Sequence, residues 1–415
     1  MRHASLSFVF ITLALDVLGI GLIIPVAPRL VAQVMGLGEG QAEGAARASA
    51  ALIATYALMQ LIFSPILGAL SDRYGRRPVI LISLFGSAID YVAMAFAPSL
   101  LWLFVTLAIN GVSGANITAC TAYIADVTPP EKRAAGFGLI GAAFGLGFVF
   151  GPLLGGWLGH YDLRYPFFAA AALTGANWLY GLLVLPESLP PELRSRQFTL
   201  KRANPATAIF GLFRRPVIKF FAATQFLVNM AQYSLQTTWV LFTGAKFGWG
   251  TMEVGWSLAL VGLTAAAVQG GLARKLIPRL GEGRSLILGL AIATVAYAGY
   301  GLAPQGWMIY WIIAAASIGA IAGPAGTALI SMATPPTEQG AVQGAFTSTQ
   351  AIAQIIGSLM GGELLKYFTS DAAPVWLPGA PLLASSLLCL GALGVAVIAV
   401  RNLPDRSAAD QSQTG

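Results

Sequence analysis

Long apolar stretches alternate with short polar segments along almost the whole chain of 415 residues. A run of about 20 apolar residues is long enough to cross a bilayer as a helix. The pattern predicts twelve transmembrane helices, and this even number places both termini on one side of the membrane. The predicted spans are Leu6–Pro25, Ala50–Leu70, Val79–Ala97, Leu100–Ile124, Gly136–Leu158, Phe167–Leu185, Val217–Phe242, Val254–Leu272, Leu286–Leu302, Trp307–Met332, Ala341–Leu365 and Ala380–Val400.

The longest polar stretch lies in the middle of the chain, from Pro186 to about Pro216, and contains the sequence PESLPPELRSRQ. Clustered prolines and charges are typical of a loop. The predicted organisation is a six-helix bundle over 1–185, a linker over 186–216, a second six-helix bundle over 217–400 and a tail over 401–415.

An internal repeat relates the two predicted bundles, because an offset of 206 residues pairs identical residues of the two halves. Since each half has an even number of spans, the repeat is parallel, and a substrate site is expected between the halves near the middle of the membrane. The pairs include Gly75 and Gly281, Thr128-Pro129-Pro130 and Thr334-Pro335-Pro336, Gly138 and Gly344, Gly151 and Gly357, and Gly155-Gly156 and Gly361-Gly362.

Charged residues make up 10% of the chain and hydrophobic residues 56%. A soluble domain has about 25% charged residues, so the composition excludes a soluble protein, and despite the net charge of +7 it disfavours a nucleic-acid-binding protein. Nineteen of the 24 Lys and Arg residues fall in the termini, the linker and the loops on their side of the membrane. Cytoplasmic loops are enriched in basic residues, so both termini and the linker are predicted to be cytoplasmic.

Residues that could support enzymatic or metal chemistry are scarce. Cys120 and Cys389 lie far apart in apolar runs, and the two histidines are His3 and His160. These residues are too few and too far apart in the sequence to indicate a zinc site or a histidine-based catalytic triad. We therefore expect no enzymatic activity, no bound metal and no cofactor.

Two acids, Asp16 and Asp90, lie well inside predicted spans. An acid in mid-membrane costs about 2.5–3.5 kcal/mol on insertion scales and normally faces a cavity or a partner. Burial disfavours the charged form of a carboxyl group, which allows it to exchange protons near neutral pH. We predict proton coupling or substrate contact, with a purely structural hydrogen bond as the alternative, and we expect Tyr91 to contact an aromatic substrate or to serve packing alone.

The seventh span carries Gln225, Asn229, Gln232 and Gln236 at spacings of four, three and four. This spacing places four amides along one face of a helix. Such a face either lines a wet cavity or hydrogen-bonds to another helix; we favour a substrate cavity. The eleventh span repeats the spacing with Gln343, Thr347, Gln350 and Gln354, of which Gln350 is a candidate cavity residue.

Two motifs are rich in glycine. In the fifth span Gly147, Gly151, Pro152, Gly155 and Gly156 form GxxxGPxxGG. Glycines four apart let helices approach closely, and proline removes a backbone hydrogen bond.

The loop after the second span reads GALSDRYGRR and places an acid beside three arginines, which could form a breakable charge cluster. Its candidate gating residues are Gly68, Asp72, Arg73, Gly75 and Arg76.

These motifs resemble those of the major facilitator superfamily, along nearly the whole chain. The loop at Gly68–Arg77 is similar to the superfamily's signature, and Gly147–Gly156 is similar to a motif of its drug/proton antiporters. More narrowly, four segments resemble the tetracycline-efflux subgroup of Gram-negative bacteria. These are Leu15–Leu30, Ile89–Pro98, Ala122–Gly156 and Lys246–Leu263.

The resemblance implies roles for individual residues. Asp16 and Asp90 match membrane acids of the subgroup, Asp72 and Arg76 match gating charges, and Asp126 matches an acid that pairs with the loop arginine. It also implies a bacterial inner-membrane protein in which proton influx drives the expulsion of a drug by alternating access.

Three positions depart from the subgroup's pattern. Leu107 replaces an arginine in the fourth span, Ala293 an acid in the ninth, and Ala265 a histidine found in the eighth span of some relatives. In the resembling proteins the ninth-span acid is central to the exchange of metal-tetracycline for protons. The substrate therefore remains open between tetracycline and another amphipathic or aromatic compound, and a divalent metal is relevant only as part of a chelated drug.

The leading hypothesis is a monomeric, proton-coupled drug exporter of the inner membrane, with a small molecule, protons and lipid as its partners. An uncoupled facilitator or a metabolite carrier of the same fold is the alternative. A non-transporting sensor is a third possibility, which the short polar tail Arg401–Gly415 disfavours.

Overall fold

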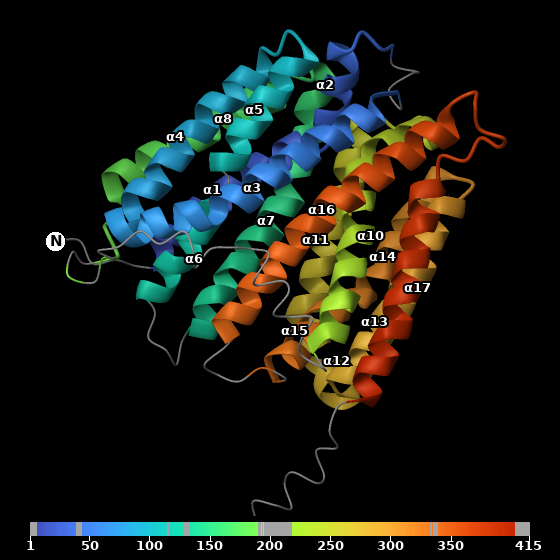
Figure 1. Cartoon of the computed structure of the whole chain (residues 1–415). Coiled ribbons are helices and arrows are strands. Elements are labelled where there is room, and N and C mark those ends of the chain that lie inside the picture. Colours follow the sequence, from blue (N-terminus) through green and yellow to red (C-terminus); the bar gives the residue numbers. More distant parts are fainter. Residues whose placement is uncertain are drawn as a thin grey trace, which may run out of the picture.

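A computed structural model of the chain describes residues 6–38, 44–113, 116–127, 133–189, 192, 194, 218–332, 334 and 339–402. Within these residues the structure is helical, without a strand, and the helices form two groups that lie side by side (Figure 1). Most of the predicted linker, the tail from residue 403 on and the repeated Pro129-Pro130 and Pro335-Pro336 pairs lie outside the described residues.

The helices of the first half make six successive passes, because α1 and α2 share one pass and so do α5 and α6. Their bounds are α1 Leu6–Ile23, α2 Ala27–Val34, α3 Ala46–Tyr74, α4 Arg76–Ala95, α5 Leu100–Ser113, α6 Asn116–Val127, α7 Arg133–Tyr161 and α8 Tyr165–Val184.

The described helices of the second half also make six passes. Their bounds are α10 Ile218–Phe247, α11 Thr251–Ala267, the π-helical turn η5 Val268–Leu272, α12 Ala273–Leu280, α13 Glu282–Leu302, α14 Gly306–Ala316, the 3-10 turn η6 Ser317–Ile321, α15 Ala322–Met332, α16 Gln339–Thr369 and α17 Ala380–Arg401. We call the end where α3 and α8 finish and α10 begins the linker end, and the other the opposite end.

Two of the differences between the predicted spans and the observed helices occur where proline or glycine weakens the helix. The first bends by 45° between α1 and α2, at Pro25 and close to Pro28, since proline cannot donate a backbone hydrogen bond. The eighth continues beyond Leu272 to Leu280, through the π-helical turn that contains Gly270 and Gly271.

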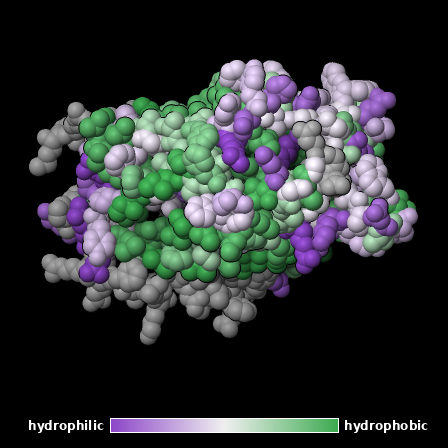
Figure 2. All heavy atoms as spheres, turned by 90° about the horizontal axis from the view of Figure 1, so that it is seen from above, coloured by the Kyte–Doolittle hydropathy of each residue, from purple (hydrophilic) through white to green (hydrophobic). Residues whose placement is uncertain are grey.

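The outer surface of the described helices is apolar, as expected for contact with lipid. Ile82 is 73% exposed and Val295 is 72% exposed. Hydrophobic side chains cover the middle of the face in Figure 2, and hydrophilic ones gather toward its sides.

By length and composition, six of the described helical segments can cross a membrane, or seven if the bent α1 and α2 form one span. Two further helices, α5 and α11, are apolar but shorter.

Each half packs mainly on itself, and two pairs of helices make the most extensive contacts between the halves. In the first half α1 lies against α7 and α8, and in the second half α10 lies against α16 and α17. The halves meet where α7 packs on α11 and where α3 packs on α16. A site that both halves line therefore lies between these two seams.

Candidate functional site

A central cavity of about 380 Å³ lies between the halves. Its walls are mostly apolar and aromatic, and polar groups are few. Lining residues from the first half include Ile20, Ile23, Tyr56, Tyr91, Leu107, Asn110 and Phe167. Those from the second half include Gln232, Tyr233, Gln236, Trp239, Tyr300 and Gln354.

Asp90 lies beside this cavity, behind Asn110. Asp90, on α4, is 3% exposed, and the side-chain amide of Asn110 on α5 donates a hydrogen bond of 2.7 Å to its carboxyl group. Because Asn110 itself lines the cavity, a ligand can affect Asp90 through this one amide. Sequence reasoning missed Asn110, although an asparagine inside the apolar fourth span was a usable signal.

Asp16 also lies behind the cavity wall. It is 8% exposed on α1 and close enough to the phenol groups of Tyr56 and Tyr91 to interact with them electrostatically. Both tyrosines line the cavity. The two membrane acids thus sit near the same cavity, each separated from it by polar side chains.

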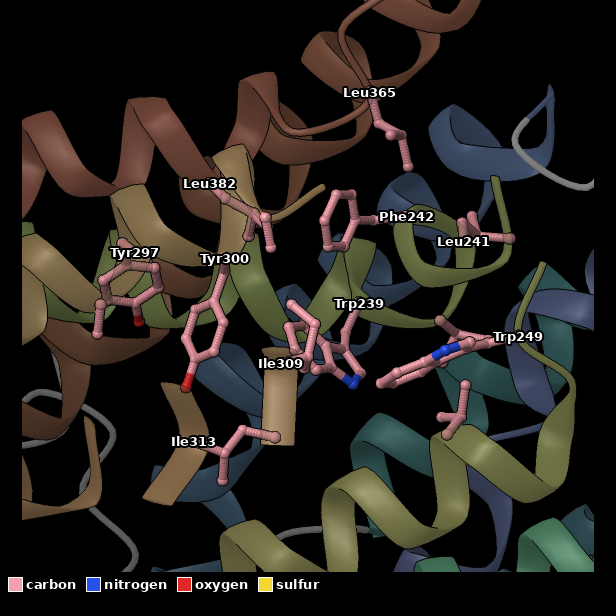
Figure 3. Close-up of a cluster of buried hydrophobic side chains, with 14 of the residues drawn as sticks. Trp239, Leu241, Phe242, Trp249, Tyr297, Tyr300, Ile309, Ile313, Leu365 and Leu382 are labelled. Carbon is pink, nitrogen blue, oxygen red and sulfur yellow. The ribbon is translucent and has the colours of Figure 1, made fainter. Parts of the chain in front are cut away.

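The second half contributes an aromatic wall, which the sequence analysis did not anticipate (Figure 3). Trp239 on α10 and Tyr300 on α13 meet edge to face, with ring centroids 5.4 Å apart. The indole of Trp239 donates a hydrogen bond of 3.1 Å to Ser257, which holds the ring in place. Tyr297 similarly fixes Gln232 by donating a hydrogen bond of 3.0 Å to its side-chain oxygen.

The four amide side chains along one face of α10 line two different cavities. Gln232 and Gln236 line the central cavity, whereas Gln225 and Asn229 line a second one of about 160 Å³. On α16, Gln350 lines this second cavity, and Gln354, one turn further along, lines the central one. The remaining lining residues of the second cavity are Thr327, Ile330, Phe346 and Thr347; the side chain of Gln343 lies outside the described residues.

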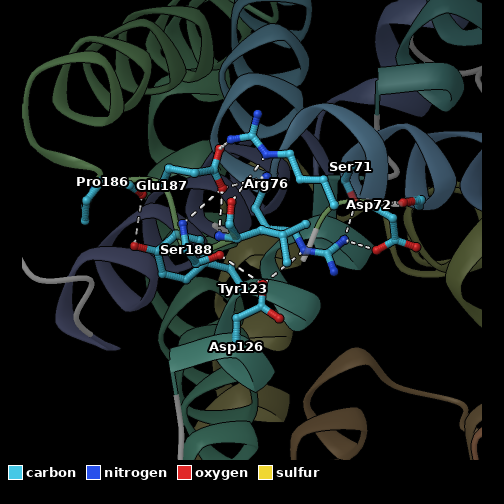
Figure 4. Close-up of polar contacts among 11 residues, drawn as sticks. Ser71, Asp72, Arg76, Tyr123, Asp126, Pro186, Glu187 and Ser188 are labelled. Carbon is cyan, nitrogen blue, oxygen red and sulfur yellow. Dashed lines mark hydrogen bonds and ion pairs between the residues drawn. The ribbon is translucent and has the colours of Figure 1, made fainter. Parts of the chain in front are cut away.

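At the linker end, Arg76 holds together a group of polar residues that we call the linker-end cluster: Ser71, Asp72, Arg76, Asp126 and Glu187 (Figure 4). Its guanidinium group lies 2.5 Å from Asp72 and 3.1 Å from Asp126, and donates a hydrogen bond of 2.7 Å to Ser71. The side chain of Arg76 is only 10% exposed. The cluster therefore ties α3, α4 and α6 together.

Sequence reasoning missed Ser71 as a member of this cluster, and it also missed Glu187, which lies just past α8. Glu187 accepts a hydrogen bond of 2.9 Å from the backbone N–H of Arg76, and its side chain lies against Gly75. Gly75 has a φ of 107°, which a residue with a Cβ rarely adopts. Gly68 accepts a hydrogen bond from Ser71, and among the described residues Arg73 stacks on Tyr74 without an ion pair.

The glycine-rich motif of α7 faces two partners. A Cβ at Gly147, Gly151 or Gly155 would collide with α1. A Cβ at Gly156 would lie 2.5 Å from the backbone oxygen of Thr251 on α11. The carbonyl of Pro152 also lies against Gly255 of α11. The motif thus forms the seam between the halves as well as packing within the first half.

Comparison with known proteins identifies the family. A sequence model of the Major Facilitator Superfamily matches residues 9–358. The chain belongs to the major facilitator superfamily. This superfamily consists of transporters, so the chain is a multi-pass membrane transporter and not an enzyme, and the predicted fold of two six-helix bundles is confirmed.

Individual relatives narrow the resemblance to the tetracycline-efflux subgroup. Tetracycline resistance protein class G of Vibrio anguillarum is 37% identical over 402 residues, which cover 94% of this chain and 97% of that protein. Class C of Escherichia coli is 35% identical over 386 residues, covering 92% and 94%. The structure of the nucleoside transporter NupG has a TM-score of 0.76 at 13% identity, covering 96% of this chain and 99% of that chain, and shares the fold alone.

In the part of the chain that the structure describes, polar contacts of Arg29, Arg47 and Thr251 join the halves of this transporter at the opposite end. Arg29 on α2 donates a hydrogen bond to the backbone oxygen of Trp249, and Thr251 donates one of 3.0 Å to that of Gly156. Arg47 on α3 lies 2.7 Å from Glu363 on α16. The sequence analysis assigned no role to Arg29 or Arg47. Both are among the basic residues outside the predicted cytoplasmic segments.

Two of the positions that depart from the subgroup's pattern place apolar side chains at or near the site. Leu107 lines the central cavity, and Ala293 packs against the buried cluster that contains Trp239 and Tyr300. Within the part of the chain that the structure describes, no group of three or more His, Cys, Asp or Glu is placed to hold a metal ion. Asp90 and Asp16 are thus the acids near the central cavity in the described residues.

Proposed function

We propose that this transporter is a proton-coupled exporter of the bacterial inner membrane, which expels a small amphipathic drug, tetracycline-like or another antibiotic, by alternating access. The observation that carries the proposal is the position of Asp90, buried beside the cavity and linked to it by Asn110. The names of the relatives, tetracycline resistance proteins, support the drug class.

Asp90 and Asp16 are the proposed coupling groups. A buried carboxylate among apolar groups is costly, and protonation removes that cost. Binding of a drug next to Asn110 alters the surroundings of Asp90, so that drug and proton occupy the site in alternation. The flat rings of Tyr91, Trp239 and Tyr300 provide the apolar contacts for the body of the drug.

The arrangement of contacts supports an inward-open state. The proposed orientation, with both termini and the linker cytoplasmic, follows from the excess of basic residues on that side. The opposite end, which Arg29, Arg47 and Thr251 hold closed, is then periplasmic. Export requires these contacts to break while the linker ends of the two halves approach one another.

Uptake of radiolabelled tetracycline into inverted vesicles under an imposed pH gradient tests the proposal. We expect gradient-driven uptake by the wild type and loss of the gradient-driven component in Asp90→Asn. Asp162→Asn serves as the matched control, because Asp162 is an exposed acid in the loop before α8. Equal, gradient-insensitive uptake by the wild type and Asp90→Asn would refute coupling.

An uncoupled facilitator or metabolite carrier is the second candidate function. It is favoured by the apolar side chains of Leu107 and Ala293, which leave Asp16 and Asp90 as the acids near the cavity. For such a carrier, transport would be the same in both directions across the membrane and would not respond to the pH gradient in the same vesicles.

A further inference from the structure

We propose that the second cavity is a binding subsite for the uncharged hydroxyl and amide groups of an amphipathic ligand on its way to the central cavity. We call it the polar pocket and define it by Gln225, Asn229, Thr327, Thr347 and Gln350. The inference rests on the proposed export function, because it places a step of ligand entry before the central cavity.

The polar pocket lies nearer to the linker end than the central cavity does. Gln225 and Asn229 precede Gln232 and Gln236 along α10, which begins at the linker end. On α16, which begins at the same end, Gln350 precedes Gln354. A ligand that enters from the linker end therefore meets the polar pocket first.

The chemistry of the pocket suits an uncharged polar group. Its polar side chains are two glutamines, an asparagine and two threonines, and none of the described residues that line it is charged. Amides and hydroxyls both donate and accept hydrogen bonds. The amide of Gln225 donates to Asn229 at 3.4 Å, which is long for a hydrogen bond, so a ligand hydroxyl can replace this contact at little cost.

One hydrogen bond connects the walls of the two cavities. Gln350 lines the polar pocket, Tyr233 lines the central cavity, and the amide of Gln350 donates a hydrogen bond of 2.9 Å to the tyrosine hydroxyl. A ligand with an apolar body and a polar edge can place the body against the aromatic wall and the edge across this pair. The two cavities together thus select a ligand with two chemically distinct parts.

Binding to the full-length protein in lipid nanodiscs tests the subsite. The probes are tetracycline, which carries hydroxyl and amide groups along one edge, and tetraphenylphosphonium, which is aromatic and has no hydrogen-bonding group. The variants Asn229→Leu and Thr347→Val remove polar groups from the pocket. Thr349→Val is the matched control, because Thr349 lies on the same helix, outside the pocket, and bonds to its own helix.

We expect the Kd for tetracycline to rise about three- to tenfold in each pocket variant, the range for loss of one hydrogen bond. The Kd for tetraphenylphosphonium should change less than twofold, as should both constants in Thr349→Val. A thermal unfolding curve for each variant verifies that it is folded. Absence of tetracycline binding to the wild type, unchanged affinity in both pocket variants, or an equal loss for both probes would overturn the subsite.

Uptake by the same variants into inverted vesicles separates this inference from the proposed function. Gradient-driven export with unchanged tetracycline affinity in both pocket variants would overturn the subsite and leave the export function standing. Selective loss of tetracycline binding, together with uptake that ignores the pH gradient, would support the subsite and refute coupled export.

Discussion

Gly156 and Gly362, which are 206 residues apart, make equivalent contacts at the two seams between the halves. A Cβ at Gly156 on α7 would lie 2.5 Å from the backbone oxygen of Thr251 on α11, and one at Gly362 on α16 would lie 2.8 Å from that of Ala46 on α3. Each half therefore presents a glycine of its fifth pass to the second pass of the other half. In the proposed alternating access, the halves would turn against one another at these close backbone contacts.

Replacing Gly156 with valine should separate α7 from α11 and reduce transport at least tenfold, because the added side chain meets backbone rather than a flexible side chain. Gly145→Val is the control on the same helix, since a Cβ at Gly145 meets nothing within 4 Å. Initial rates of drug uptake in inverted vesicles, normalised to the amount of folded protein, provide the measurement. Equal rates in the two variants would contradict the role of the seam.

Truncation of Arg76 should affect transport far more than truncation of Arg73. Arg76→Ala leaves Asp72 and Asp126 without their shared cation, whereas Arg73 stacks on Tyr74. We expect at least a tenfold loss of uptake for Arg76→Ala and less than twofold for Arg73→Ala. Arg76→Lys should restore little, because an ammonium group cannot reproduce the guanidinium's several directed contacts; full rescue by lysine would show that charge alone suffices.

Breaking the ion pair between Arg47 and Glu363 should shift the protein toward opening at the opposite end. Both side chains are more than half exposed, so the pair stabilises the closed end by at most about 1 kcal/mol, or about fivefold in the equilibrium. Spin labels at Ala48→Cys and Lys366→Cys, with Cys120 and Cys389 replaced by alanine, report the distance across this end. Arg47→Glu should lengthen the distance, Arg47→Glu with Glu363→Arg should restore it, and Asp371→Asn, an exposed acid at the same end, should leave it unchanged.

Loss of the Asn110 amide should impair coupled transport although Asp90 is still present. Asn110→Leu removes both a polar group of the cavity wall and the hydrogen bond to Asp90, and we expect gradient-driven uptake to fall at least tenfold. Thr106→Val is the control on the same helix, since Thr106 is buried and bonds to its own backbone. The idea fails if Asn110→Leu retains wild-type response to the pH gradient.

Much of the fold could be predicted from the sequence because lipid imposes a simple rule. A span must be apolar over about 20 residues, so the long apolar runs marked the passes, and the constant offset of 206 residues marked the two halves. The bend at Pro25 and the π-helical turn at Gly270 and Gly271 were not predicted, because they depend on how a locally weakened helix packs against its neighbours.

The residue types of the site could be predicted from the sequence. Which of these residues line the central cavity and which line the polar pocket could not. A stripe of amides on α10 follows from spacing alone, yet the spacing cannot say that Gln225 and Asn229 line one cavity while Gln232 and Gln236 line another. That division depends on α16 and on the aromatic wall, which come from distant parts of the chain. Glu187 and the aromatic wall were missed for the same reason, whereas Asn110 had a usable signal in the sequence as an asparagine inside an apolar span.

The sequence by itself determined the membrane class, the two halves and the two acids inside apolar spans, because periodicity and scarcity of charge are local properties of a chain in lipid. Only the tertiary structure decided that Asp90 reaches the central cavity through Asn110 and that the halves meet at Gly156 and Gly362. These contacts join residues on different helices, and they depend on how side-chain shapes fit when the helices pack.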